Sequence, residues 1–331
     1  MKTLRWFALL AAFVPAWIYA AESNRVAKIV AVSGNVSVTG GAAEVGAPVT
    51  VGATVSTSSG GTASVQFFDG TITVVQPDSS VTISTHSVTT DANGAVIKEN
   101  TLLDLHAGGV VNSLDPAKKD ITSFKVRTTK GVAEAHGTVF AVRISQTTQD
   151  ASVTTMAGTV TFVTDQGTFT VPFGSFSGGS GVQTVAEAVK SNPTLAAEIL
   201  AATAQVASAI GNGSVGNTSG SPGLTTAVLA ALVDVAVQAA PSQAADTLKT
   251  VLTNAGSALS SSAVDAVTQA AVNSVTKADP ANAAANTASL VAVSTDAKGE
   301  LGLATTTTTQ PAQILPPLDQ VQVSPSGPST N

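Results

Sequence analysis

The chain has 331 residues, of which 44% are apolar, 4% aromatic and 11% charged, and it contains no cysteine. This length gives room for about two domains of ~150 residues each, with enough apolar side chains to bury a core. The lack of cysteine excludes disulfides, thiolate metal sites and a lipid-modified N-terminal cysteine. Small and short β-branched residues dominate, which suits strands and closely packed helices and leaves few groups for acid–base chemistry.

The first residues have the layout of a cleavable secretory signal. Two basic residues precede an apolar run from Trp6 to Ala20, and small and polar residues follow it. We predict a signal peptide at residues 1–21, cleaved after Ala20 or Ala21, and export to the periplasm, the cell envelope or the outside. A retained anchor is the alternative, but the run is shorter than the ~20 residues of a spanning helix.

The charge balance argues against two classes of partner. Removing the leader leaves 13 basic residues (15 − 2 = 13) against 21 acidic ones, a net charge of −8 without a basic cluster. Nucleic acid is therefore not expected to bind, and contact with a membrane is expected only through the transient signal peptide.

Short alternating runs of apolar and polar residues, separated by glycine-containing turns, fill residues 26–176. In TASVQFFDGTITVV, Asp69-Gly70 stands between two such runs, a composition that permits the positive φ angles of a hairpin turn. Repeated short strands of this kind predict an all-β domain, either a sandwich or a solenoid-like roll.

The pattern changes after the sequence FSGGSG, and we predict a flexible linker at 177–182. Apolar residues from Val185 to Ile210 then recur at helical spacing. We predict an Ala-rich helical region at 183–300, built as repeats or a bundle, with a Gly/Ser loop at 211–223. The Thr- and Pro-rich residues 305–331 are predicted to form a disordered, low-complexity tail.

Several local signals refine the helical region. Asn192-Pro193 and Asp279-Pro280 are typical helix starts, in which the side-chain oxygen caps free backbone amides. NPTLAAEIL, APSQAADTL, SSAVDAVTQ and DPANAAANT look like degenerate copies of one helical unit. Leu224–Ala240 is predicted as a buried helix rather than a membrane span, because Asp234 near its middle would cost on the order of 2.5 to 3.5 kcal/mol at a bilayer centre.

Several blocks of the β half follow one another in the order of a known family. GAPVTVGATVSTSSGGTASVQFFDGTITVVQPDSSVTI contains a G-x-x-V-x-T-x-x-x-G-x-A run that leads into F-x-D-G-T-x-x-x-x-x-P-x-S. FKVRTTKGVAEAHGTVFAVRI is similar to a V-x-T-P-x-G-V-A-x-V-R-G-T-x-F-x-V block, with Thr129 in place of the usual proline and His136 where arginine is frequent. With VAKIVAVSGNVSVT before them and MAGTVTFV after them, these blocks resemble the FecR domain family across roughly Val26 to Phe162. We interpret the following motif residues as structural: Gly52, Thr57, Asp69, Gly70, Thr71, Pro77, Gly131, Gly137, Thr138, Phe140, Val142 and Gly158.

The resemblance implies a non-catalytic, extracytoplasmic domain. Regulatory members of the family resemble signal transducers, with a cytoplasmic segment that holds a sigma factor, one membrane helix and an outer part that contacts an outer-membrane transporter. In this sequence the β domain directly follows the export signal. Direct binding of a sigma factor is therefore not expected.

Few residues offer catalytic or metal chemistry. Asp104-Leu105-His106 and Glu134-Ala135-His136 are acid–histidine pairs at strand spacing, and together they could supply four metal ligands. Nothing in the sequence brings the pairs together, so we predict no metal, no cofactor and no catalytic residue. His86 is predicted to lie at an exposed strand end. No G-x-S-x-G elbow or phosphate-loop lysine occurs, which favours a protein that is not an enzyme.

Two functions remain open. The first is an exported binding or scaffold protein that contacts a protein or a cell-envelope polysaccharide through edge strands or a polar Thr/Ser face, with possible oligomerisation through the helices. The second is an accessory of cell-surface signalling that contacts an outer-membrane transporter or regulator without itself binding a sigma factor.

Overall fold

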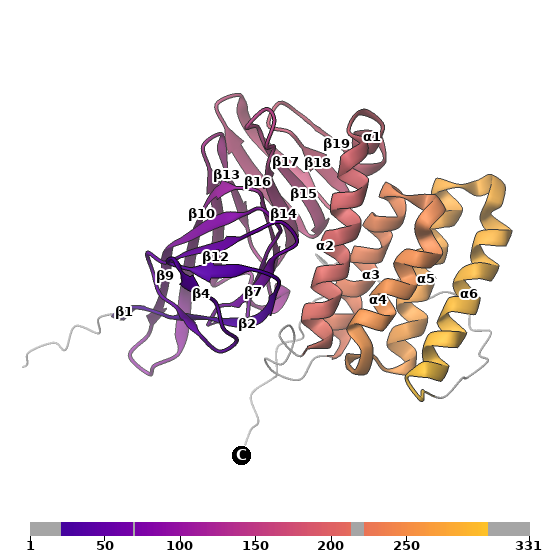
Figure 1. Ribbon diagram of the computed structural model, residues 1–331, viewed down its shortest axis with the longest axis horizontal. Helices are drawn as coiled ribbons and strands as arrows, with labels where there is room; N and C mark the ends of the chain where they lie inside the picture. The colour runs from indigo at the N-terminus through magenta and orange to yellow at the C-terminus, as the bar shows by residue number, and fades with distance from the viewer. Residues whose placement is uncertain (1–20, 69, 213–221, 304–331) are drawn as a thin grey trace, which may run out of the picture.

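The computed structural model describes residues 21–68, 70–212 and 222–303, and these residues form two β-sheets followed by six α-helices (Figure 1). The sheets pack face to face as a sandwich, which confirms the predicted order of an all-β part and a helical part. The predicted tail, residues 1–20 of the predicted signal peptide and most of the predicted Gly/Ser loop lie outside the described residues.

One sheet, here called the outer sheet, lies on the side of the sandwich away from the helices (Figure 1). Its strands, in spatial order, are β17 (Gly167–Pro172), β16 (Thr159–Thr164), β13 (Gly131–Ala135), β12 (Thr122–Thr128), β10 (Val96–Ala107), β9 (Ser80–Thr90), β6 (Thr54–Thr57), β3 (Val36–Val38) and β4 (Gly41–Ala42). A further strand, β1 (Ala21–Asn24), pairs with β9. Among the described pairs of this sheet, β10 and β12 run parallel and the others antiparallel.

The second sheet, here called the inner sheet, lies between the outer sheet and the helices. Its strands, in spatial order, are β19 (Val182–Thr184), β18 (Ser175–Ser177), β15 (Ala151–Ala157), β14 (Val139–Ile144), β11 (Gly109–Ser113), β8 (Ile72–Val75), β7 (Thr62–Gln66), β2 (Ala27–Ser33) and β5 (Pro48–Val49). Every described pair in it is antiparallel.

The predicted linker at 177–182 is wrong. β18 and β19 pair antiparallel, with Ser177 opposite Val182, so residues 178–181 form the turn of a hairpin. Gly179 has a φ of +86°, which a glycine adopts without strain. The β part therefore runs from Ala21 to Thr184 rather than over 26–176, and it passes directly into the first helix.

The core of the sandwich forms where the two sheets face each other. Phe140, Val142 and Ile144 alternate inward along β14 and are fully buried, as their spacing predicts. The ring of Phe124 lies between those of Phe67 and Phe140, with centroid distances of 5.8 and 6.3 Å in edge-to-face geometry. Such aromatic pairs add about 0.5–1.5 kcal/mol each beyond the burial of their area.

The helices form an array of two rows. They are α1 (Val185–Ser191), α2 (Pro193–Gly211), α3 (Pro222–Ala239), α4 (Ala244–Ala255), α5 (Ser261–Ala278) and α6 (Ala283–Glu300). In one row α2 packs against α4 and α4 against α6, and in the other row α3 packs against α5. Neighbours in a row are thus two helices apart in the chain, which is the packing of stacked helical repeats rather than of a closed bundle.

Three of the four predicted copies begin helices of the same row. Pro193 is the first residue of α2, while Pro241 and Pro280 begin short 3-10 turns that lead into α4 and α6. The fourth copy, SSAVDAVTQ, begins α5 in the other row. The predicted side-chain caps are wrong, because neither Asn192 nor Asp279 accepts a backbone hydrogen bond with its side chain.

The first helices of the array cover the inner sheet. Ile72, Val74 and Val111 of the inner sheet are buried in one cluster with residues of the helices. On the helical side this cluster includes Leu195 and Ile199 of α2. The two parts of the chain therefore share one apolar core. Burying each side chain of this size contributes about 1.5–3 kcal/mol to stability.

Two helices are apolar enough to raise the question of a membrane span. In α3, Leu229, Leu232 and Val233 are fully buried, in agreement with the predicted buried helix. By length and composition α2 could also cross a membrane, and it is the one described helix that meets both criteria. Its apolar side chains pack on the inner sheet and on neighbouring helices, which accounts for its composition.

Candidate functional site

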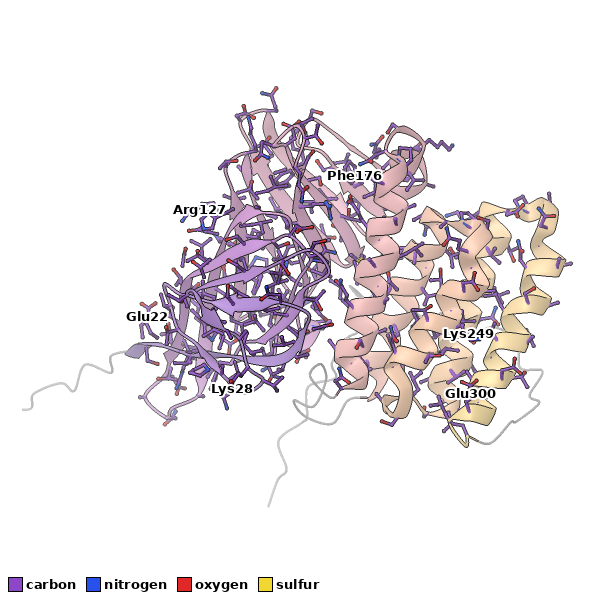
Figure 2. The ribbon with its side chains drawn as sticks, in the orientation of Figure 1. Glu22, Lys28, Arg127, Phe176, Lys249 and Glu300 are labelled. Carbon is purple, nitrogen blue, oxygen red and sulfur yellow. The ribbon has the colours of Figure 1, made fainter. Side chains whose placement is uncertain are left out.

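One face of the outer sheet is turned to solvent and is polar. Because side chains alternate along a strand, the neighbours of these residues in sequence point into the core, as Phe124 and Val126 do beside Lys125. Figure 2 shows Arg127 on the side of the sandwich away from the helices. We call this surface the open face, and its polar residues include Thr54, Thr82, Ser84, Asp104, His106, Lys125, Arg127, Glu134, Thr161 and Thr170.

An ion pair lies near the middle of the open face. The parallel register of β10 and β12 places Asp104 beside Arg127, and the guanidinium Nε and Nη2 each donate to one carboxylate oxygen at 2.6 Å. The hydroxyl of Ser84 also donates to Asp104. Partial burial raises the pKa of Asp104, but hydrogen bonds from Arg127 and Ser84 outweigh burial and hold this pKa below its usual value.

A second cluster lies between β12 and the next strand, β13, two residues before Arg127 on β12. Glu134 of β13 is opposite Lys125 of β12, with 3.2 Å between Lys125 Nζ and the carboxylate. His136 lies 3.6 Å from the other carboxylate oxygen of Glu134, and its Nδ1 is 2.5 Å from the carbonyl oxygen of Thr122. Gly137 follows with a φ of +65°, so the chain turns directly after this pair.

Hydroxyl groups continue the open face toward β6. The Oγ1 atoms of Thr54 and Thr82 are 2.8 Å apart, and Thr82 Oγ1 is 2.9 Å from Nε2 of His106. Thr54 and Thr82 are direct cross-strand neighbours. Cross-strand contacts of this type fix side-chain rotamers, so the hydroxyls and the imidazole present a defined set of hydrogen-bonding groups.

The two acid–histidine pairs share the open face but do not converge. β12 lies between β10 and β13, and it supplies a basic residue to each acid, Arg127 to Asp104 and Lys125 to Glu134. Within the described ranges no three His, Asp or Glu side chains come together in a geometry that could hold a metal ion. The arrangement offers paired charges and hydrogen-bonding groups for recognition.

The predicted position of His86 is wrong. His86 is only 2% exposed, because β9 continues to Thr90 and His86 lies in the interior of the strand, facing the core. Nδ1 lies 3.1 Å from the hydroxyl of Thr101, and the ring packs edge-on against Phe67 at 5.0 Å. The pairing of β9 with β10 shifts between Thr85 and Ile83, which lie opposite Leu102 and Leu103, so the alternation slips by one residue and turns His86 to the core. Strict alternation from Ile83 places His86 on the other face, and this is why the sequence pattern did not reveal its burial.

The motif residues build the backbone of the sandwich rather than the open face. Gly52, Gly70 and Gly158 have positive φ angles of +89°, +89° and +75°. A Cβ on Gly131 would lie 2.6 Å from the carbonyl oxygen of Val163 on the next strand. Thr71 and Thr138 are buried, and Asp69 lies outside the described residues.

Sequence reasoning missed the basic residues of the open face. The alternation in TSFKVRT places Lys125 and Arg127 on one face of β12, so the face they share could be predicted. Their acidic partners could not, because they depend on the parallel pairing of β10 with β12, which joins strands separated by a crossover.

A smaller polar site lies between α2 and the inner sheet. Arg143 of β14 and Glu198 of α2 approach to 3.2 Å between Nε and Oε1. They line a cavity of about 20 Å³ together with Gln76, Ser152 and Thr154. Burial raises the pKa of Glu198, and the charge of Arg143 offsets only part of this effect. This volume is close to the space that one water molecule occupies.

One protein-family model matches part of the β-sandwich. Residues 53–161, about a third of the chain, match the family model described as FecR protein. The match supports a role connected with cell-surface signalling and an association with the cell envelope. The matched residues run from just before β6 into β16 and include every charged residue of the open face.

Similar solved structures cover less than half of the chain. Two crystal structures of a proposed anti-sigma factor from Parabacteroides distasonis ATCC 8503, at 1.65 and 2.50 Å resolution, share 15% sequence identity with it, with TM-scores of 0.31 and 0.30. Each match covers 37% of this chain and 52% of the other, so the match spans about half the length of those proteins. No curated protein matches the sequence.

Proposed function

We propose that this protein is exported and that its FecR domain binds a partner in the cell envelope through the open face, without catalysis. The observation that carries this proposal is the asymmetry of the sandwich. Helices cover the inner sheet, whereas the outer sheet presents a polar face whose charged groups are already paired and oriented. Paired and oriented groups lose little side-chain entropy on binding, which favours recognition.

The composition of the open face indicates the kind of partner. Acidic and basic residues alternate across β10, β12 and β13, and threonine hydroxyls flank them on both sides. Such a surface complements either the backbone and polar side chains of a protein or the hydroxyl groups of an envelope polysaccharide. It has no net basic character, so nucleic acid does not fit it.

The experiment uses mature protein, residues 21–331, as bait against envelope extracts and against isolated envelope polysaccharides. We expect wild-type protein to retain a partner and Arg127→Glu to lose most of it. Lys249→Glu, on the exposed side of α4, is the matched control and should bind like wild type (Figure 2). If no protein or polysaccharide is retained, or if both variants bind equally, the proposal is wrong.

Export is tested separately. Fractionation should place the protein outside the inner membrane, and its intact mass should correspond to a chain that starts at Ala21 or Glu22. Cleavage after Ala20 leaves β1 complete, because this strand starts at Ala21 and pairs with residues 87–90 of β9. Recovery of the uncleaved chain in the membrane fraction would instead support a retained anchor.

A second candidate is an accessory of cell-surface signalling, and the FecR match at 53–161 favours it. In this reading the open face contacts an outer-membrane transporter or a regulator, and a separate protein carries the signal inward. Deletion of the gene should then change transcription of a transport system, and Arg127→Glu should reproduce this change. Unchanged transcription after deletion would leave the binding or scaffold role alone.

A further inference from the structure

The basic residues of the open face are more exposed than the acidic residues they pair with. The side chain of Arg127 is 52% exposed and that of Asp104 only 20%. The same order holds for Lys125, at 41%, and Glu134, at 32%. The formal charges of these four residues cancel, but a partner that approaches the face meets the cationic groups first.

The hydrogen-bonding capacity of these groups is unequal in the same sense. Asp104 accepts three hydrogen bonds, from Nε and Nη2 of Arg127 and from the hydroxyl of Ser84, and a carboxylate has about four acceptor sites. A guanidinium has five N–H groups and an ammonium three, so Arg127 and Lys125 each keep donors that their acidic neighbours do not engage. A partner can satisfy these donors with carboxylate oxygens.

Aliphatic side chains interrupt the polar open face beside the two basic residues. Val132 of β13 is the cross-strand neighbour of Arg127, and Val163 of β16 is the neighbour of Val132. Both valines point away from the core, because their neighbours in sequence on the same strands are buried in it. Leu102 of β10 lies opposite Lys125 and is half-buried. We call Leu102, Lys125, Arg127, Val132 and Val163 the Arg127 patch.

We propose that the Arg127 patch binds a protein segment that places carboxylates over Arg127 and Lys125 and aliphatic side chains over Val132 and Val163. This inference rests on the proposed function and names the chemistry of its partner. Arginine is enriched at protein–protein interfaces and among the residues that dominate their affinity. A polysaccharide has no aliphatic side chains with which to cover the two valines, so the apolar part of the patch favours a protein.

The charge of the whole chain restricts where an acidic segment can dock. Without the predicted leader the chain has a net charge of −8 (13 − 21 = −8), so its surface as a whole repels an acidic partner. At the Arg127 patch the most exposed charges are positive, and this local complementarity orients the partner on the sheet.

The probe is a fluorescent synthetic peptide that repeats Glu-Ser-Val-Ser three times. In an extended chain its glutamates and valines share one side, because successive side chains alternate. We expect the mature protein to bind this peptide more tightly than a peptide with lysine in place of glutamate. Polygalacturonate, which has carboxylates but no aliphatic side chains, should compete poorly. Fluorescence anisotropy measures the dissociation constants and the competition.

Two pairs of variants test the two parts of the patch. Arg127→Gln should weaken binding of the glutamate peptide about tenfold, as expected for the loss of an interface anchor. Its matched control, Glu134→Gln, removes an acid on the next strand and should leave the affinity unchanged or raise it. Val163→Thr should weaken binding about threefold, because less apolar surface is buried. The same substitution at Val45, an exposed valine between β4 and β5, should have no effect.

Several outcomes would overturn the proposal. Tighter binding of the lysine peptide, or a loss of affinity in Glu134→Gln but not in Arg127→Gln, would show that the partner supplies donors rather than carboxylates. Displacement of the peptide by polygalacturonate at an equal carboxylate concentration would assign the patch to a polysaccharide. If the mature protein retains an envelope partner but does not bind the glutamate peptide, this inference fails and the proposed function stands. If it retains no envelope partner either, both fail.

Discussion

At the scale of single residues, a cluster around Ser79 fixes three turns of the sandwich. Thr57 donates its hydroxyl to the carbonyl of Gln76 at 2.5 Å and accepts the N–H of Ser79 at 3.0 Å. Ser79 Oγ accepts the N–H of Gly109 at 2.8 Å. These bonds join the end of β6, the turn before β9 and the turn between β10 and β11, which explains why a buried Thr and Ser stand here.

Gly108 packs so closely against this cluster that a larger residue does not fit there. It has a φ of +71°, and a Cβ would fall 2.5 Å from the carbonyl oxygen of Asp78 and 2.7 Å from Ser79 Cα. We expect Gly108→Ala to lower the free energy of unfolding by about 1–3 kcal/mol or more, measured by urea denaturation. Gly94→Ala is the control, with a φ of +80° and open space around its Cβ. Equal losses in both variants would show that the close approach is unimportant.

Asp104 gives a pH-dependent prediction. Its pKa is lowered in the folded protein, so its ionised form stabilises the fold above the unfolded pKa, and this contribution is lost as the pH falls through the folded pKa. Asp104→Asn should therefore be less stable than wild type at pH 7, and the difference should shrink as the pH falls below the ordinary pKa of an aspartate and vanish below the lowered folded pKa. Urea denaturation across this range measures the difference. A gap that does not close on acidification would contradict the assignment.

At the scale of elements, the contact between α2 and the inner sheet joins the two halves of the chain. It is apolar over most of its area, with the Arg143–Glu198 ion pair at one side. Removing the carboxylate of Glu198 from water destabilises its ionised form more than the charge of Arg143 stabilises it, because the pKa of Glu198 is raised rather than lowered. This pair therefore fixes the register of α2 on the sheet more than it stabilises the contact.

The sign of that shift predicts a second pH effect. A raised folded pKa gives stability that is present below the unfolded pKa of Glu198 and is lost as the pH rises through the folded pKa. Wild type should therefore lose stability, relative to Glu198→Gln, as the pH rises from the ordinary pKa of 4.5 through the higher pKa of the folded state. The measurement is the difference between the two unfolding free energies at each pH. A constant difference would show that Glu198 titrates normally.

At the scale of the whole molecule, the sandwich and the helical array share a core and should unfold together. On the side of the inner sheet that faces the helices, Ile72, Val111 and Met156 are buried in one cluster with helix residues. Such a surface would be exposed if the β part stood alone, since the turn at 178–181 provides no flexible spacer. We therefore expect the β part and the helical part to unfold cooperatively, as one unit.

A fragment that lacks the helices should expose the apolar residues that the helices cover in the full chain. Residues 21–184 alone should bind a hydrophobic dye and associate, whereas the full mature chain should remain dispersed and unfold in one transition followed equally by strand and helix signals. The fragment with Ile72→Ser and Met156→Ser is the control and should bind less dye. Two separate transitions in the full chain would show that the halves are independent.

Much of this architecture was predictable from local patterns. Alternation located strands such as β12 and β14, helical spacing located α2 and α3, and ordered glycine motifs indicated the FecR domain. The open face was predicted only as a polar Thr/Ser face. Its ion pairs escaped prediction, because Asp104 and Arg127 meet through a parallel pairing between strands that are distant in sequence.

The sequence by itself determined which residues share a face of each element, because the periods of strands and helices are set by local backbone geometry. Only the tertiary structure decided which faces are covered. Val74 and Val75 are equally apolar neighbours, yet Val75 points into the sandwich and Val74 toward the helices. Burial of His86, the hairpin at 178–181 and the exposure of the open face were decided in the same way, since each depends on packing between segments that no local pattern connects.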